Sequence, residues 1–164
     1  MDASKQKFIQ LIKHPVKFRM FLFSKLPAAY FSGVRVISIN ESSAVVSVPY
    51  KWFTTNPFKS TYFACLAMGA EMSTGLLAMM NTFKSNPSIS MLVTGLQANY
   101  FKKAIGSTTF TCNQGNEIGQ TIDEAIKTGQ GKIITVKSVG VNDAGELVAE
   151  FFITWSFKIK SRLA

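Results

Sequence analysis

Residues 56–81 read NPFKSTYFACLAMGAEMSTGLLAMMN, and they indicate a long helix at the centre of the fold. From Thr61 to Met80 there is no proline, and Ala, Leu, Met and Glu, which favour helices, predominate. Pro57 precedes this run and Ser60 can cap it, so we expect the helix to begin near Thr61. Apolar residues occur on every side of the helix, which is typical of a helix enclosed by protein or by lipid.

Glu71 is the only charged residue between Lys59 and Lys84. Residues 62–80 are long enough to span a bilayer, but a charge at its centre costs about 2.5–3.5 kcal/mol, so we expect enclosure by protein. The neighbours of Glu71 on its own helical face are mostly small, and a ligand or another backbone could approach its carboxylate closely. These neighbours are Ala64, Ala67, Met68, Thr74, Gly75 and Ala78.

Length and composition are those of one globular domain, residues 1–164. The formal net charge of +9 favours anionic partners, which include nucleic acid, lipid headgroups and phosphorylated ligands. Six of the eighteen basic residues lie among apolar residues near the amino terminus, and no nucleic-acid-binding motif occurs. We therefore expect no nucleic-acid partner.

Cysteine and histidine are too few for a metal site or a disulfide framework. Cys65 and Cys112 are expected to be buried thiols of a reducing compartment, and His14 is the single histidine. The amino terminus has no continuous apolar run followed by a cleavage site, so we expect a cytoplasmic location.

Residues 1–26 are expected to form a helical arm of two short amphipathic helices broken at Pro15. Its basic residues alternate with apolar ones, and no acid occurs between Asp2 and Glu41. We expect the arm to cover one end of a sheet with its lysines in water, and contact with a membrane surface is the alternative.

Strand-like runs follow in pairs. Residues 34–40 and 43–50 predict a hairpin, residues 89–103 and 107–113 a pair that turns at Gly106, and residues 132–141 and 146–160 a pair joined by a turn at 142–145. Residues 119–128 predict a short helix. This order predicts an α+β fold in which a curled antiparallel sheet wraps around one long apolar helix.

Three local patterns resemble the hotdog-fold acyl-CoA thioesterase superfamily, in particular its phenylacetyl-CoA thioesterases. The run from Asn56 through Tyr62, Phe63 and Ala64 to Glu71 is similar to their Asn...His-Gly-Gly...Asp/Glu signature. Residues 99–106, NYFKKAIG, resemble the strand ending Asn-Phe-Leu-Arg-Pro-Ala-x-Gly, and residues 143–149, DAGELVA, resemble the last hairpin. The resemblance covers residues 34–157, the expected hotdog core, and is closest to the uncharacterised branch without the His-Gly-Gly motif.

The resemblance implies hydrolysis of an acyl-CoA, with coenzyme A as part of the substrate and no separate cofactor. Glu71 would act as general base or nucleophile, Asn56 would orient water or the carbonyl, and the amide of Phe63 or Ala64 would bind the oxyanion. Coenzyme A would meet the second pattern at Asn99, Lys102 and Lys103. Since neighbouring strand residues point to opposite faces, at most one lysine should face a given ligand.

The helix separates these groups along its axis. Eight residues between Phe63 and Glu71 correspond to about 12 Å, whereas a base must lie within about 3 Å of its proton. The resemblance likewise implies a homodimer in which Glu71 faces the partner's Phe63, and a dimer of dimers is left open.

Each site residue also has a structural interpretation. Glu71 could be a protonated carboxyl bonded to a hydroxyl such as that of Thr74, and Asn56 could be a turn residue. Phe63 occupies room that glycine would leave in the thioesterases. The alternative function is therefore binding of an acyl or other apolar ligand without turnover.

Overall fold

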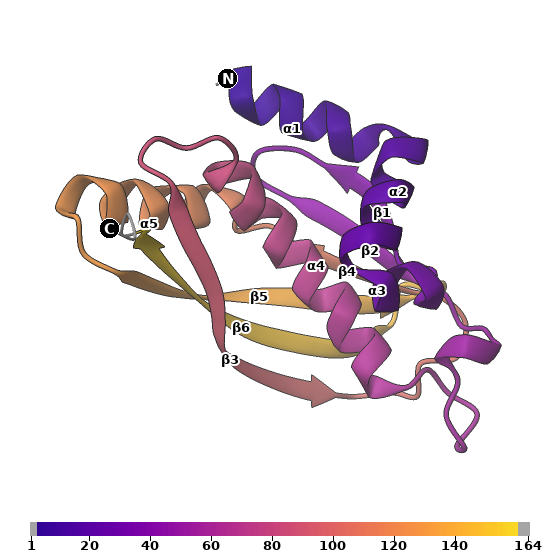
Figure 1. Cartoon of the computed structure of the whole chain (residues 1–164). Helices are drawn as coiled ribbons and strands as arrows, with labels where there is room; N and C mark the ends of the chain where they lie inside the picture. Colours follow the sequence, from indigo (N-terminus) through magenta and orange to yellow (C-terminus); the bar gives the residue numbers. More distant parts are fainter. Residues whose placement is uncertain (1–2, 161–164) are drawn as a thin grey trace.

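The computed structural model describes residues 3–160, in which a six-stranded sheet curls around one helix (Figure 1). The helices are α1 (Ala3–Lys13), α2 (Pro15–Lys25), α3 (Pro27–Ser32), the 3-10 helix η1 (Trp52–Thr54), α4 (Phe63–Thr82) and α5 (Gly115–Thr128). The strands are β1 (Arg35–Ile39), β2 (Ala44–Val48), β3 (Ile89–Tyr100), β4 (Thr108–Cys112), β5 (Lys132–Asn142) and β6 (Leu147–Ile159). The predicted α+β architecture is confirmed; residues 1, 2 and 161–164 lie outside the described residues.

The sheet encloses α4, in which twelve of twenty residues are buried. A glycine lets the helix backbone approach the sheet, because a Cβ on Gly69 would lie 2.3 Å from Cγ2 of Val48 and 3.0 Å from the ring of Phe110. By length and hydropathy α4 could cross a membrane, but 67% of its most apolar segment is buried within the protein. This burial is typical of a core helix.

The helix begins at Phe63, two residues later than predicted. Thr61 lies in an isolated bridge with Thr55, and its N–H and hydroxyl donate to the carbonyl of Ala104 at 2.9 and 3.2 Å. The Ser60 hydroxyl lies 3.2 Å from the Asn56 side-chain oxygen, so it does not cap the helix. These tertiary contacts hold residues 60–61 outside the helix.

The strand order across the sheet is β1-β2-β4-β5-β6-β3, and all neighbours are antiparallel. The hairpins β1–β2 and β5–β6 are confirmed. The predicted pairing of residues 89–103 with 107–113 is wrong, because β3 pairs with β6 while β4 lies between β2 and β5. β3 therefore forms one edge of the sheet, twelve residues long, whereas β1 forms the other edge with five.

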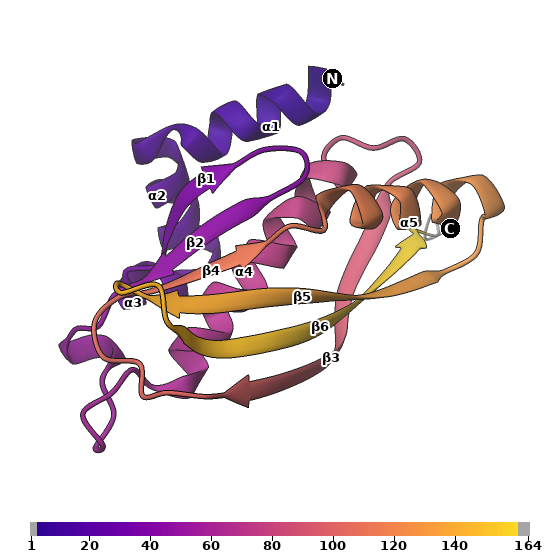
Figure 2. The same cartoon turned by 180° about the vertical axis from the view of Figure 1, so that it is seen from behind.

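From Ala149 to Trp155 of β6, alternate residues are buried. Phe151, Ile153 and Trp155 face the core, and Figure 2 shows the outer face, where β5 and β6 run in front of α4. Leu147 is exposed at the strand's beginning.

The arm forms the two predicted helices on either side of Pro15, followed by a third, α3, that was not predicted. Phe8, Ile12, Phe18 and Leu22 are buried, and α1 and α3 contact α4 (Figure 1). α1 also contacts β1 at the edge of the sheet, so the arm covers this side of the sheet, as expected, and packs on α4 as well.

The predicted helix at 119–128 begins earlier, at Gly115. Gly115 approaches the backbone of Glu41, and Gly119 approaches the side chain of Asn81. Close packing against these residues, rather than helix propensity, explains the two glycines in the first turns.

Candidate active site

A groove of about 550 Å³ opens at the amino-terminal end of α4. Its two walls are the loop that leads into the helix and the loop that follows β3, and the bonds from Thr61 to the carbonyl of Ala104 join them. Aromatic and basic side chains dominate its lining. The lining residues are Asn56, Pro57, Phe58, Ser60, Thr61, Tyr62, Phe63, Leu66, Tyr100, Phe101, Lys102, Lys103 and Ala104.

The groove brings together four of the residues that the sequence singled out: Asn56, Phe63, Lys102 and Lys103. Ala64 follows Phe63 in the first turn of α4 but is not among the lining side chains. Asn99 is exposed on β3, opposite Glu150 in the strand register, and is also not among them.

The first turn of α4 presents two unpaired backbone donors. Tyr62 is the N-cap, and its carbonyl accepts from the amides of Cys65 and Leu66 at 2.9 and 3.3 Å. Within residues 3–160, the N–H groups of Phe63 and Ala64 have no acceptor. The first amides of a helix carry partial positive charge, so this turn can stabilise an oxyanion.

The side chain of Phe63 is 57% exposed and forms part of the groove wall. Its ring packs edge-on against that of Tyr62, with centroids 4.9 Å apart. A bound acyl group would meet these two rings beside the unpaired amides.

Asn56 organises the loop in front of the helix. Its side-chain oxygen accepts from the amides of Phe58 and Ser60 at 3.0 and 3.2 Å, and its side-chain nitrogen lies 3.1 Å from the Ser60 hydroxyl. These bonds are typical of a turn residue, and they use both the oxygen and the nitrogen of the Asn56 side chain. To orient water or a carbonyl, Asn56 would have to share these bonds with the ligand.

Both lysines line the groove. The expectation that at most one of them faces a ligand rested on strand alternation, and that premise is wrong here. That expectation extended the strand to Lys103, but β3 ends at Tyr100 and the lysines lie in the following loop, where side chains need not alternate. Lys102 pairs with the exposed Glu146 at 2.5 Å, while Lys103 donates to the carbonyl of Phe58 at 3.5 Å.

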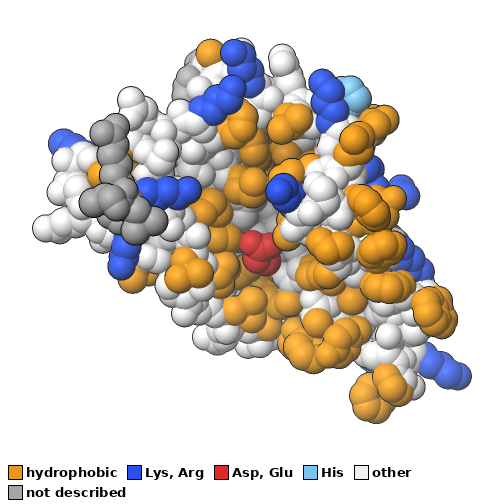
Figure 3. All heavy atoms as spheres, in the orientation of Figure 1, with side chains coloured by type: hydrophobic (Ala, Val, Ile, Leu, Met, Phe, Trp, Pro, Cys, Tyr) orange, Lys and Arg blue, Asp and Glu red, His pale blue; other side chains and the backbone are white. Residues whose placement is uncertain are grey.

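Glu71 lies two turns further along α4 and is not among the groove residues. Its side chain is partly buried, and desolvation raises the pKa of its carboxyl group above 4.5. Among residues 3–160, no hydrogen bond or ion pair to its carboxylate is found. Figure 3 shows an acidic side chain, in red, in a hollow over α4 that is surrounded by hydrophobic side chains.

The alternative in which the Thr74 hydroxyl bonds the Glu71 carboxyl is not found. That hydroxyl donates to the backbone carbonyl of Glu71 at 2.9 Å and accepts from the indole N–H of Trp155 at 3.0 Å. The carboxylate instead lies beside Gly75, where a Cβ would be 2.9 Å from Oε1. The carboxylate therefore occupies the room that Gly75 leaves, and the residue remains only partly buried.

Sequence reasoning missed three side chains that shape these places. Tyr100 and Phe101 line the groove, and the pattern at residues 99–106 already contained them as a signal. Trp155 bonds Thr74, and no local signal relates these two residues, which are 81 positions apart in the chain.

Comparison with known proteins agrees with this architecture. A family described as "Domain of unknown function (DUF4442)" matches residues 17–157. No curated protein matches the chain.

Similar solved structures include proteins described as thioesterases or probable thioesterases. A Pseudomonas aeruginosa protein described as a probable thioesterase has a TM-score of 0.75 at 18% identity, and the match covers 89% of this chain and 97% of that one. A Haemophilus influenzae thioesterase has a TM-score of 0.65 at 12% identity, and the match covers 91% of this chain and 94% of that one. The E. coli PaaI protein from the phenylacetic acid degradation operon has a TM-score of 0.64 at 15% identity, and the match covers 93% of this chain and 94% of that one. At these identities the likeness establishes the hotdog fold, as the sequence patterns implied.

Proposed function

The chain belongs to the DUF4442 family and has the hotdog fold, and from that premise we propose that it hydrolyses an acyl-CoA thioester across a dimer interface. The observation that carries this proposal is the carboxylate of Glu71. It is partly buried, has a raised pKa, has no partner among the described residues and lies among small residues. Such a carboxylate is typical of a catalytic base.

In the proposed reaction, Glu71 takes a proton from water as the water oxygen bonds to the thioester carbonyl carbon. The partner's Phe63 or Ala64 amide donates to the oxygen that becomes negative. The carbon–sulfur bond then breaks, and the coenzyme A thiolate takes the proton from Glu71. This transfer returns Glu71 to its ionised form, and the products are free coenzyme A and a carboxylic acid, which then loses its own proton to solvent.

The dimer follows from the separation between the two parts of the site. Glu71 and Phe63, whose amide would bind the oxyanion, lie about 12 Å apart along α4 of one chain, so a second chain must bring the two groups together. β3 offers a surface for this, because it pairs only with β6 and leaves a long edge with Leu92 and Leu96 exposed. Pairing of two β3 edges would give a two-fold dimer, and a dimer of dimers would need a further surface.

Coenzyme A would lie along the groove. Lys103 and Lys102 would bind its phosphates, with Lys102 exchanging its exposed partner Glu146 for phosphate. Asn56 would hold the loop on which the acyl group rests, and Asn99 could contribute only from outside the groove.

The two free cysteines, Cys65 and Cys112, are buried, and burial raises the pKa of the Cys112 thiol to about 11. Unmodified thiols suit a reducing compartment, and we propose the cytoplasm as the place of action. The proposal requires no metal or separate cofactor.

Binding without turnover is the second candidate, and the side chain of Phe63 favours it. This ring stands in the groove wall where the thioesterase signature has glycine, and it takes space beside the amides that would hold the oxyanion. The groove could then hold an apolar acyl ligand without positioning its carbonyl.

The test is hydrolysis of short-chain, long-chain and aromatic acyl-CoAs by the parent and by Glu71→Gln. The proposal expects turnover of at least one substrate, with kcat reduced at least about a hundredfold in a variant that remains folded and dimeric. Glu117→Gln, which changes an exposed acid on α5 outside the proposed site, serves as the matched control. Absence of turnover, together with acyl-CoA binding, would establish the second candidate.

A further inference from the structure

The arm has a second apolar face that the core does not use. Phe18 and Leu22 of α2 are buried, whereas Val16, Met20 and Phe23 of the same helix are 60%, 67% and 58% exposed. Their spacing of four and three residues places these three side chains in one stripe along the helix. α2 is therefore apolar both toward the protein and toward its surroundings.

The stripe continues through ring contacts into neighbouring elements. The ring of Phe23 contacts Phe31, which contacts Phe53, and Phe53 contacts Trp52, with centroid separations of 6.3, 6.2 and 6.4 Å. Trp52 is 87% exposed. We name this surface the aromatic patch: Val16, Met20, Phe23, Phe31, Trp52 and Phe53. Figure 3 shows hydrophobic side chains over α2 and α3, with basic side chains at their margin.

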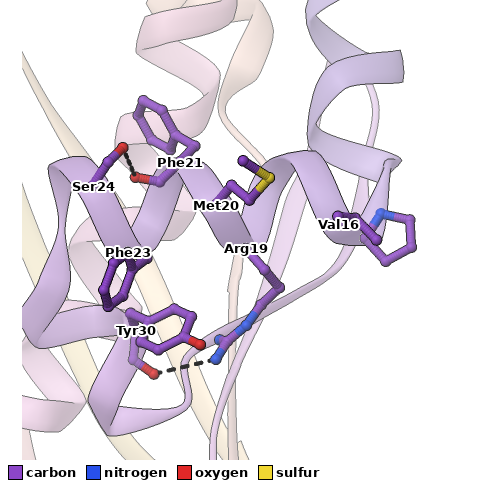
Figure 4. A pocket seen from close by; sticks show the side chains of 8 residues that line it. Val16, Arg19, Met20, Phe21, Phe23, Ser24 and Tyr30 are labelled. Atoms are coloured by element: carbon purple, nitrogen blue, oxygen red, sulfur yellow. Dashed lines mark hydrogen bonds between the residues drawn. The ribbon is translucent and has the colours of Figure 1, made fainter.

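A groove of about 730 Å³ opens within this surface, and Arg19 lies in its wall (Figure 4). Its guanidinium stacks over the ring of Tyr30, 4.0 Å from the centroid, and donates to the Tyr30 carbonyl at 3.5 Å. Nη1 is buried without a hydrogen-bond partner, and no carboxylate within residues 3–160 pairs with Arg19. A partly buried guanidinium in this state is suited to bind an external anion.

Charge around the patch has one sign. Exposed lysines adjoin it at Lys17 and Lys25 on α2 and at Lys51 beside Trp52, and none forms an ion pair in the described part of the chain. No acid occurs between Asp2 and Glu41. A two-fold contact between two copies of this patch would bring like charges together, which disfavours self-association through it.

We propose that the aromatic patch docks on an anionic phospholipid bilayer. The apolar side chains enter the boundary between headgroups and acyl chains, the lysines meet the anionic headgroups, and Arg19 binds a headgroup phosphate in the groove. The arm thus has two roles: its inner face covers the core and its outer face binds lipid. This proposal uses none of the residues of the candidate active site and does not depend on thioester hydrolysis.

Flotation of the full chain with vesicles tests the proposal. We expect binding to phosphatidylcholine vesicles that contain about 30% phosphatidylglycerol, and about tenfold weaker binding to pure phosphatidylcholine. The double variant Met20→Ser/Trp52→Ser should lose about tenfold in binding. Ile133→Ser is the matched control, because Ile133 is 65% exposed on β5 outside the patch and its loss should change nothing.

A second pair of variants tests the charges. Lys17→Gln/Lys25→Gln and Arg19→Gln should each weaken binding to the anionic vesicles, while Lys127→Gln on α5 should not. Circular dichroism of each variant establishes that it is folded. Equal binding to neutral and anionic vesicles, or unchanged binding by Met20→Ser/Trp52→Ser, would overturn the proposal. So would an oligomer that this double variant dissociates, since the patch would then join copies of the chain.

Discussion

Oε1 of Glu71 lies 2.9 Å from the point that a Cβ on Gly75 would occupy. This is closer than a real Cβ approaches another side chain, so the glycine makes room for the carboxylate in its present position. The nearest ring atoms of Trp155 lie 3.4 and 3.5 Å from the same point, which is ordinary contact. A methyl group there would therefore displace the carboxylate and leave the core in place.

Gly75→Ala should lower kcat/KM for the acyl-CoA substrate about ten- to a hundredfold, because the base moves away from its water. Its thermal stability should stay equal or rise, since alanine favours a helix by about 1 kcal/mol over glycine. Gly69→Ala is the contrasting variant, because its Cβ would meet Val48 and it should lower stability. Parent-like kinetics in Gly75→Ala would mean that the position of Glu71 is unimportant.

Mixed dimers test whether two chains share each site. Phe63→Pro removes one candidate oxyanion donor, and proline suits the first position of a helix that follows the extended Tyr62. If the Phe63 amide is the essential donor, Phe63→Pro and Glu71→Gln should each be inactive alone. Refolding equal amounts of the two together should restore about a quarter of the parent activity, because about half of the dimers are mixed and each mixed dimer has one of its two sites intact. Phe63→Ala keeps the amide and is the control for loss of the ring. No recovery in verified mixed dimers would place both groups in one chain.

Stability should depend on pH through Glu71. Burial raises the pKa of its carboxyl, so the folded state favours the protonated form, and the stability this gives is present below about pH 4.5 and lost as pH rises through the raised value. Glu71→Gln should therefore increase Tm at about pH 8 and have little effect at about pH 4. An increase of equal size at both pH values would exclude a titration effect.

Glu146 should affect the pH dependence of stability in the opposite direction to Glu71, and it serves as the comparison. Its hydrogen bond with Lys102 lowers the pKa of its carboxyl, so the ionised form is favoured and its contribution is present above about pH 4.5 and lost on acidification. Glu146→Gln should slightly lower Tm at neutral pH, by a small amount because the pair is exposed.

The hydroxyl of Thr74 should stabilise the fold through Trp155. Thr74→Val removes the acceptor of the indole N–H and should cost about 1–3 kcal/mol of unfolding free energy. Trp155→Phe alone and with Thr74→Val completes a double-mutant cycle in urea denaturation. Additive effects would show that the bond contributes nothing.

Lys103 should act on the nucleotide part of the substrate. Lys103→Met is expected to raise KM for acyl-CoA about fivefold, equivalent to about 1 kcal/mol, and to leave KM for the acyl-pantetheine unchanged because that substrate lacks the nucleotide phosphates. Lys127→Met on α5 is the charge-matched control. An equal rise with both substrates would assign Lys103 to the shape of the loop instead.

The local patterns predicted α4, the break at Pro15 and the two hairpins, because helix propensity, proline and alternation act within a few residues. They also identified Glu71 as a lone carboxylate. The resemblance to thioesterases added six site candidates, of which four line one groove and two, Ala64 and Asn99, do not. The role of each in catalysis remains a prediction.

Tertiary structure alone decided which strands pair and which polar groups meet. β3 lies beside β6 rather than β4, because pairing depends on how long strands align across the whole sheet and not on their order in the chain. The same packing brings Trp155 to Thr74, whose hydroxyl bonds the indole and the Glu71 backbone carbonyl and not the Glu71 carboxylate. It also ends β3 at Tyr100, so both lysines reach the groove from a loop. The sequence by itself determined the helix and its isolated acid; contacts between residues far apart in the chain determined what surrounds that acid.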